Sequence, residues 1–383
     1  MPHYPLPIPP IVIEAIDGKD KAFFGAPWIT RRAENRAAIQ KLSGVINTIY
    51  ESGAPFFTKD AIRDLVRQID EAGVRRVQTE PVSLRFSVTG IDGKTADIPV
   101  KLGVKHGGAQ GVELDGVELF GAILKIEFRT IDHLTSIAAN HADEFDPDKA
   151  FLSMAVEVET VPVLLLTGEA VPPYPINRAP ETRAILHGQR TKWNASNAYR
   201  QLVKAMLADA GSLPRVDKVV AFACFNPSDV EAAEKSATEH ALVIISLRDF
   251  FARQQHQPTT SVRCYAQDPL YQDVDREVLG ELGMTVLDHP RGFLEVDDAT
   301  AVFSQSPTAP VRQVIADIAR PALMIWNRIC EIPREGSWVG VTEQSDNISP
   351  RLEEMIRNHY IELPFPADLA GFGSLLAIYV RKY

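Results

Sequence analysis

The second half of the chain alternates short β-rich runs with amphipathic helical segments, and this alternation constrains the fold more than any other feature. The predicted strands are Lys218–Phe222, Ser261–Tyr265, Met284–Leu287, Ala299–Ser304 and Ala322–Trp326. Helices are predicted at Lys59–Glu71, Ala195–Ala210, Val311–Ile318 and Pro350–His359. Because a crossover helix buries its apolar stripe on the sheet, strands that alternate with helices pair in parallel. We therefore expect an α/β fold.

A proline-rich stretch divides the chain. Val171–Pro180 carries four prolines, which cannot donate hydrogen bonds to a strand ladder and so indicate an extended linker. The predicted regions are an N-terminal α+β region with helices and a hairpin sheet (1–175), a Rossmann-like, doubly wound, mostly parallel core (176–345), and a C-terminal helix with a closing strand packed on that core (346–383). The sequence leaves open whether the N-terminal half is a separate domain.

Charge and composition exclude several classes of protein. With 40 Lys and Arg against 50 Asp and Glu, the formal net charge is −10, which argues against nucleic acid or an anionic membrane as the main partner. No apolar run reaches the ~18 residues that span a bilayer, and Met1–Pro10 lacks the pattern of a secretion signal. Cys224, Cys264 and Cys330 are widely spaced, which indicates a reducing compartment. We expect the cytoplasm, with the nucleus as the alternative.

Several motifs of the second half resemble one family. They are Val219–Cys224, Glu239–Leu242, Tyr265–Pro269, Leu279–Gly283 and Phe303–Pro307. Over roughly residues 195 to 330 the chain resembles the sensitivity-to-red-light-reduced family, in its fungal branch. The resemblance implies a regulatory role, in light input and timing in plants or in growth and stress in fungi, and brings no established catalytic residues. The chain departs from many members at Cys224–Pro227, where a glycine-containing turn is usual, and at Ser306–Thr308, where Pro-His-Cys is usual.

Polar residues follow the predicted strands at their carboxyl ends, where the ligand crevice of an open parallel sheet lies. The candidate ligand-binding residues are Cys224, Asn226, Asp268, Tyr271, His289, Ser304, Ser306 and Asn327. Asp268 is either a carboxylate that binds ribose hydroxyls or a turn former ahead of Pro269. Phe225 and Pro227 obstruct the close backbone approach that a pyrophosphate needs, which argues against a dinucleotide. S-adenosylmethionine or another nucleoside-type ligand stays open as the cofactor.

Three other patterns have less specific interpretations. Cys224, His289 and Asp268 supply a nucleophile, a base and a carboxylate, but no flanking motif accompanies them, and a cysteine is commonly a small buried apolar residue. His240 falls on the apolar stripe of its helix and is predicted to be a core or interface histidine. His187–Trp193 is predicted to be a loop anchored by its tryptophan, with a lid or a peptide contact over the crevice as the alternative. No spacing of potential ligands fits a metal site that we recognise.

Three functional hypotheses follow. The first is a regulatory intracellular protein that binds a small molecule or a partner protein at the crevice. The second is an S-adenosylmethionine-dependent methyltransferase that uses the same crevice, because five strand and helix units followed by a closing strand is also that class's order. The third is a non-catalytic scaffold that binds proteins through its N-terminal hairpin region. The sequence does not decide whether the chain is an enzyme, and its oligomeric state is unknown.

Overall fold

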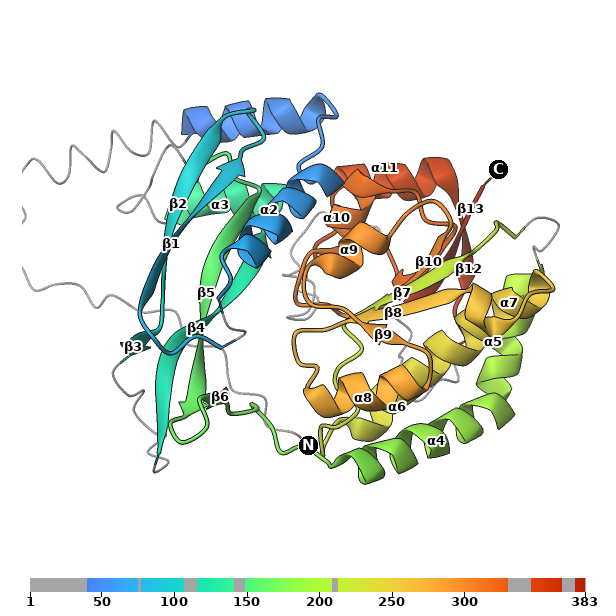
Figure 1. Cartoon of the computed structure of the whole chain (residues 1–383). Helices are drawn as coiled ribbons and strands as arrows, with labels where there is room; N and C mark the ends of the chain where they lie inside the picture. Colours follow the sequence, from blue (N-terminus) through green and yellow to red (C-terminus); the bar gives the residue numbers. More distant parts are fainter. Residues whose placement is uncertain are drawn as a thin grey trace, which may run out of the picture.

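A seven-stranded sheet forms the centre of the second half of the chain (Figure 1). The computed structural model describes residues 40–74, 77–106, 116–140, 149–208, 213–329, 346–366 and 376–382, so Met1–Pro10 and Cys330 lie outside the described residues. The strand order is β12-β13-β11-β10-β7-β8-β9. The strands are β7 (Lys218–Phe222), β8 (Arg263–Gln267), β9 (Thr285–Val286), β10 (Thr300–Ser304), β11 (Leu323–Asn327), β12 (Tyr360–Pro364) and β13 (Leu376–Arg381).

Strands β7 to β11 are mutually parallel, whereas β13 runs antiparallel to both of its neighbours, β11 and β12. The expected mixed α/β architecture with a mostly parallel sheet is therefore confirmed. All five residues of β7 are buried. Because side chains alternate along a strand, Val219 and Ala221 join the hydrophobic cluster on one face, and Val220 and Phe222 join the cluster on the other.

Helices cover both faces of this sheet (Figure 1). One face carries α4 (Ala179–Ala195), α5 (Asn197–Ala208), α6 (Ala233–Ala241) and α8 (Asp273–Glu281). Beyond α6 the helix continues as a π-helical segment (Leu242–Asp249) and then as α7 (Phe250–Gln254). The other face carries α9 (Arg291–Glu295), α10 (Val311–Ile318) and α11 (Pro350–His359). Among the described residues, no helix has the length and apolar character needed to cross a bilayer.

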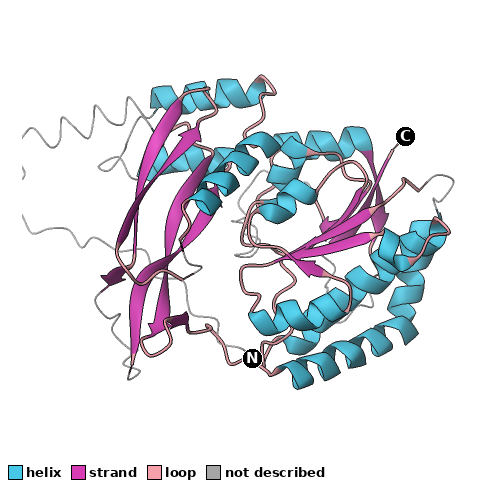
Figure 2. Cartoon of the chain, viewed as in Figure 1, coloured by secondary structure: helices cyan, strands magenta, loops and turns pink. Residues whose placement is uncertain are grey.

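The N-terminal region consists of helices and antiparallel strands (Figure 2). Its helices are residues 40–51, α2 (Lys59–Glu71) and α3 (Ile131–Asn140), and its strands are β1 (Val82–Thr89), β2 (Thr95–Leu102), β3 (Val104–His106), β4 (Val117–Phe128), β5 (Met154–Leu164) and β6 (Glu169–Ala170). Strands β1 and β2 form a hairpin, whereas β3 to β6 form a four-stranded sheet in sequence order. Helix α2 begins after Thr58, whose side chain accepts a hydrogen bond from the Ala61 amide at 3.2 Å and so caps the first turn.

The N-terminal region and the core share one hydrophobic cluster. Phe128 of β4 packs edge-on against Phe293 of α9, with ring centroids 5.1 Å apart. Phe293 in turn stacks on Phe222 of β7 at 4.8 Å. Phe57, which precedes the N-cap of α2, packs against Phe128 with ring centroids 5.5 Å apart. A continuous row of aromatic rings therefore joins the N-terminal region to the central strand of the parallel sheet.

The interpretation of His187–Trp193 as a loop is wrong, because these residues form the second half of α4. Trp193 is buried, and its indole N–H donates to the hydroxyl of Ser246 at 2.9 Å. The predicted helix at Ala195–Ala210 corresponds to α5, which begins at Asn197 after an extended residue, Ser196. The tryptophan therefore anchors a helix, and α4 packs along the helix that contains the π-helical segment.

Candidate functional site

The strand register brings three predicted site residues to the same edge of the sheet. Phe222, at the end of β7, pairs with Gln267 of β8 on one side and with Ser304 of β10 on the other. Asp268 directly follows Gln267, and Cys224 lies two residues beyond Phe222. The loops that bear Cys224, Asp268 and Ser304 therefore begin at one rim.

At this rim the chain leaves two neighbouring strands toward opposite faces of the sheet. The loop after β7 leads to α6 on one face, whereas the loop after β10 leads to α10 on the other (Figure 1). Such a divergence between neighbouring parallel strands is where ligands bind in open α/β sheets. Ala223 and Phe225 in the first loop and Ser306 in the second have φ angles of 55°, 55° and 49°, in the left-handed region. A non-glycine residue held there costs about 1–3 kcal/mol, and such strain gathers at functional sites.

Asp268 fixes the loop after β7. One carboxylate oxygen accepts a hydrogen bond from the Phe225 amide at 2.9 Å, and the other accepts from the Leu270 amide at 3.0 Å. Burial raises the pKa of Asp268, although these two amide donors act in the opposite direction. The interpretation of Asp268 as a turn former is confirmed by the bond from Leu270, and both of its oxygens are engaged by the backbone.

Cys224 is fully buried beside this turn. Burial raises its pKa well above the ordinary value, and the carboxyl groups of Glu239 and Asp268 raise it further. Both ring nitrogens of His289 are bonded to groups other than Cys224. Nε2 donates to the backbone carbonyl of Ile126 at 2.8 Å, and Nδ1 accepts from the side-chain amide of Gln267 at 3.3 Å. Cys224 is therefore a neutral thiol, and its proposed base is bonded to strand β4 instead.

Tyr271 binds the buried histidine of α6. The His240 ring donates from Nδ1 to the carbonyl of Ser236 at 2.7 Å and accepts at Nε2 from the Tyr271 hydroxyl at 2.8 Å. Burial lowers the pKa of His240 to about 4, so the ring is neutral at physiological pH. The prediction of a core histidine is confirmed, and Tyr271 is part of the core rather than an open side chain of the rim.

Ser306 and Asn327 join the loops that follow β10 and β11. The Ser306 amide donates to the Asn327 side-chain oxygen at 2.7 Å, and the Asn327 amide donates to the Ser306 hydroxyl at 3.3 Å. Arg312 of α10 donates to the Asn327 carbonyl at 3.2 Å and forms a buried ion pair with Asp346 at 2.9 Å. These residues hold the α10 side of the rim in place.

Three buried polar groups at the rim have no hydrogen-bond partner in the described part of the chain. They are the Asn226 side-chain oxygen, the Ser304 hydroxyl and both carboxyl oxygens of Glu239. A buried polar group without a partner costs about 1–3 kcal/mol, and native proteins contain few of them. Their position at a strained strand divergence distinguishes this rim as the candidate ligand site.

Asn226 and Ser304 are among the predicted site residues, whereas Glu239 is not, and Phe225 was expected only to obstruct a pyrophosphate. A signal for Glu239 was present. Residues Ser236, Glu239 and His240 are spaced i, i+3 and i+4 on one face of α6, and all three are buried. A carboxylate within the apolar stripe of a helix requires an explanation, because such a group is rarely buried without a partner.

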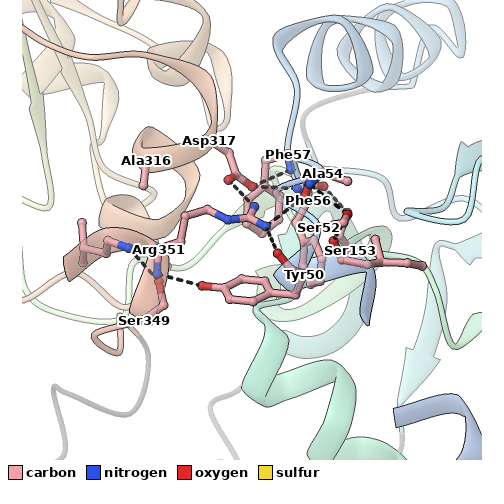
Figure 3. A network of polar contacts seen from close by, with 12 residues as sticks. Tyr50, Ser52, Ala54, Phe56, Phe57, Ser153, Ala316, Asp317, Ser349 and Arg351 are labelled. Atoms are coloured by element: carbon pink, nitrogen blue, oxygen red, sulfur yellow. Dashed lines mark hydrogen bonds and ion pairs between the residues drawn. The ribbon is translucent and has the colours of Figure 1, made fainter. Parts of the chain in front are cut away.

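A second polar cluster lies away from the rim, where the N-terminal region meets α10 and α11 (Figure 3). Arg351 pairs with Asp317 at 2.6 Å, donates to the Tyr50 carbonyl at 2.8 Å and lies over the Tyr50 ring at 4.2 Å. Asp317 also accepts from the amides of Phe56 and Phe57 at 2.7 and 3.1 Å. The cavity here has a volume of about 10 Å³, enough for one water molecule. We therefore regard this cluster as a structural joint, not as a ligand site.

Comparisons with known proteins bear on the identity of this core. No curated protein and no solved structure matches the chain. A family model does match: the model of the SRR1 domain, named for sensitivity to red light reduced, covers residues 200–365. This range begins in α5 and ends just after β12, so it includes the whole candidate rim. The resemblance to this family that the motifs predicted is confirmed over residues 200–365, where the chain matches the SRR1 domain.

Proposed function

We propose that this chain is a regulatory protein, of the light-response or stress-response type, whose SRR1 domain binds a small molecule at the rim between β7 and β10. The family supports the regulatory role. The observation that carries the binding role is the set of unpaired buried groups on Asn226, Ser304 and Glu239 beside loops in left-handed conformations. A ligand that pairs with these groups offsets the cost of burying them.

The topology of the sheet supports a Rossmann-like core. Numbered along the chain, the five parallel strands lie in the order 3-2-1-4-5, from β9 through β7 to β11. This is the strand order of dinucleotide-binding sheets, in which the ligand lies beyond the ends of the first and fourth strands. In this chain those strands are β7 and β10, which bear the strained loops.

Methyl-donor-dependent transfer is the second candidate function. The antiparallel β13 lies between β11 and β12, so five parallel units are closed by a late antiparallel strand. This is the order expected of methyltransferases, although fold alone does not determine a reaction. Phe225 and Pro227 obstruct a pyrophosphate, so a nucleoside-type ligand such as S-adenosylmethionine suits either function better than a dinucleotide.

The test combines mass spectrometry of natively purified protein with a thermal-shift panel of adenosine, S-adenosylmethionine, S-adenosylhomocysteine and ADP. A ligand at about 100 times its Kd stabilises the fold by ~2.7 kcal/mol, which gives a measurable Tm increase. The key variant is Ser304→Ala. Because it removes an unpaired buried hydroxyl, we expect the ligand-free variant to be at least as stable as the wild type and to lose most of the shift.

Thr238→Ala on α6 is the matched control, since its hydroxyl bonds within the helix, to the Glu234 carbonyl at 2.7 Å. It should keep the full ligand shift. An equal shift in Ser304→Ala and the wild type would remove Ser304 from the site. If no compound shifts the Tm and a protein copurifies instead, the scaffold hypothesis replaces the binding proposal.

Three further features stay predictions. They are membership of the fungal branch of the family, a location in the cytoplasm or nucleus, and the binding of a partner protein in place of a small molecule. The acidic composition, with a net charge of −10, continues to argue against nucleic acid as the partner.

A further inference from the structure

An aromatic ring, a carboxyl group and an ammonium group meet at the loop after β7. The Lys235 ammonium lies 4.9 Å from the centre of the Phe225 ring and 4.0 Å from a carboxyl oxygen of Glu239. The Lys235 side chain is 46% exposed, whereas the Glu239 side chain is fully buried. A half-exposed cation therefore lies between an aromatic ring and a buried acid.

Hydrogen bonds hold the backbone of Phe225 on both sides of its Cα. Its amide donates to Asp268 at 2.9 Å, and its carbonyl accepts from the Ser236 hydroxyl at 3.1 Å. These bonds keep the residue at a φ of 55°, where a bulky side chain is a true outlier. A partly exposed ring in a strained, doubly anchored position is more consistent with presenting a surface than with filling the core.

Glu239 forms a long ion pair with Lys235 but accepts no hydrogen bond from the described residues. Both of its oxygens lack hydrogen bonds in the described part of the chain, because the Lys235 ammonium at 4.0 Å lies beyond bonding distance. The nearby acids differ in this respect: Asp268 binds two amides, and Asp275 binds the amide and hydroxyl of Ser228 at 2.9 and 3.0 Å. Glu239 is thus the one carboxyl of these three that is left to attract a cation.

We propose that the Phe225 ring and the Glu239 carboxyl form a cation subsite of the ligand site, which takes a quaternary ammonium or sulfonium group and is occupied by Lys235 when the ligand is absent. This inference rests on the proposed small-molecule function. Ring faces bind such cations with about 0.5–2 kcal/mol, depending on desolvation. The surrounding carboxyl groups repel phosphate, so the ligand is an organic cation without phosphates.

The test uses choline and its neutral isostere 3,3-dimethyl-1-butanol, which differ in charge and not in shape. Binding is measured by calorimetry and thermal shift on the full chain. We expect choline to bind and the isostere not to bind. Lys235→Met removes the competing ammonium but keeps the side-chain stem, and it should tighten choline binding by roughly tenfold. Glu239→Gln and Phe225→Leu should each weaken it by roughly tenfold, the range of one cation–π contact or charge pair.

A pH series supplies a second measurement. Burial raises the pKa of Glu239 to about 8, and the groups that face it are Lys235, Cys224, Asp268 and Tyr271. Choline binding should therefore strengthen between pH 6 and 8.5 as Glu239 loses its proton. The same series on Glu239→Gln should be flat, which separates Glu239 from the other groups.

Lys192→Met on α4 is the control for loss of a surface charge, and it should bind choline as the wild type does. Equal binding of choline and its isostere, or no choline binding even by Lys235→Met, would overturn the cation subsite. The proposed function fails separately. If a nucleoside shift depends on Ser304 but not on Glu239, the rim binds a ligand and only the cation inference is wrong. If neither a nucleoside nor choline binds, the wider proposal is wrong.

Discussion

At the scale of one residue, the pKa of Glu239 depends on its burial and on the charges around it. Burial raises its pKa from 4.5 to about 8, and nearby Asp268 adds to this effect, whereas Lys235 opposes it. A folded-state pKa above the unfolded value means that the folded protein binds the proton more tightly. The contribution to stability is therefore complete below about pH 4.5 and is lost as pH rises toward 8.

Glu239→Gln should flatten this part of the stability profile. The amide is nearly isosteric and carries no charge, so the variant should gain stability relative to the wild type, by roughly 2–4 kcal/mol at pH 8.5 and far less at pH 5. Urea unfolding across this pH range measures the difference. The exposed Glu234→Gln on the same helix is the control and should leave the profile unchanged. A constant offset between wild type and Glu239→Gln at every pH would refute the assignment.

At the scale of elements, prediction succeeded where a helix has a clear apolar face or a strand is a continuous apolar run. Helices α2, α10 and α11 and strand β7 have the predicted bounds. Helix α4 was missed because two of its four buried residues, Thr182 and Gln189, are polar and hide the apolar periodicity of Leu186 and Trp193. The short strand β12 was also missed. It directly follows α11 with no turn residues between them, so no turn signal marks its start.

Trp193→Phe tests the anchoring of α4 to the π-helical segment. The substitution keeps an aromatic ring but removes the indole N–H that donates to Ser246 at 2.9 Å, so a buried hydroxyl loses its partner. We expect a loss of about 1–3 kcal/mol in the free energy of unfolding, measured by urea denaturation. Combining it with Ser246→Ala should recover part of this loss, because neither polar group is then left unpaired. A loss from Trp193→Phe no larger than that from the exposed Lys192→Ala would contradict the anchoring role.

At the scale of the whole molecule, the sequence located the rim but not its contents. The rule that ligands bind at the carboxyl ends of parallel strands placed Cys224, Asp268 and Ser304 together, since it requires only the strand order. This rule could not show that Tyr271 and His289 are not open side chains of the rim. Tyr271 bonds to His240, and His289 bonds to Ile126 of strand β4. Those bonds depend on how helices and the N-terminal region pack against the sheet, and local patterns carry no information about such long-range contacts.

The joint around Arg351 determines whether the N-terminal region and the SRR1 domain unfold together. Arg351 of α11 pairs with buried Asp317 and lies over the Tyr50 ring, so one side chain connects both parts (Figure 3). Because the two parts also share an aromatic cluster, we expect the wild type to unfold in one calorimetric transition. Arg351→Ala leaves the Asp317 charge buried without its cation and should cost about 3–5 kcal/mol.

Differential scanning calorimetry with limited proteolysis measures this coupling. In Arg351→Ala the N-terminal region should unfold first, giving a second, lower transition and early cleavage before residue 180, because the rest of the chain keeps the seven-stranded sheet and the helices on both of its faces. Arg351→Lys should fall between the two, since an ammonium keeps the charge but cannot hold Asp317 and the Tyr50 carbonyl at once with a planar fork. Arg357→Ala, exposed on the same helix, should unfold as the wild type does. Two transitions already present in the wild type would mean that the shared aromatic cluster does not couple the two parts, and that Arg351 joins domains that are independent in stability.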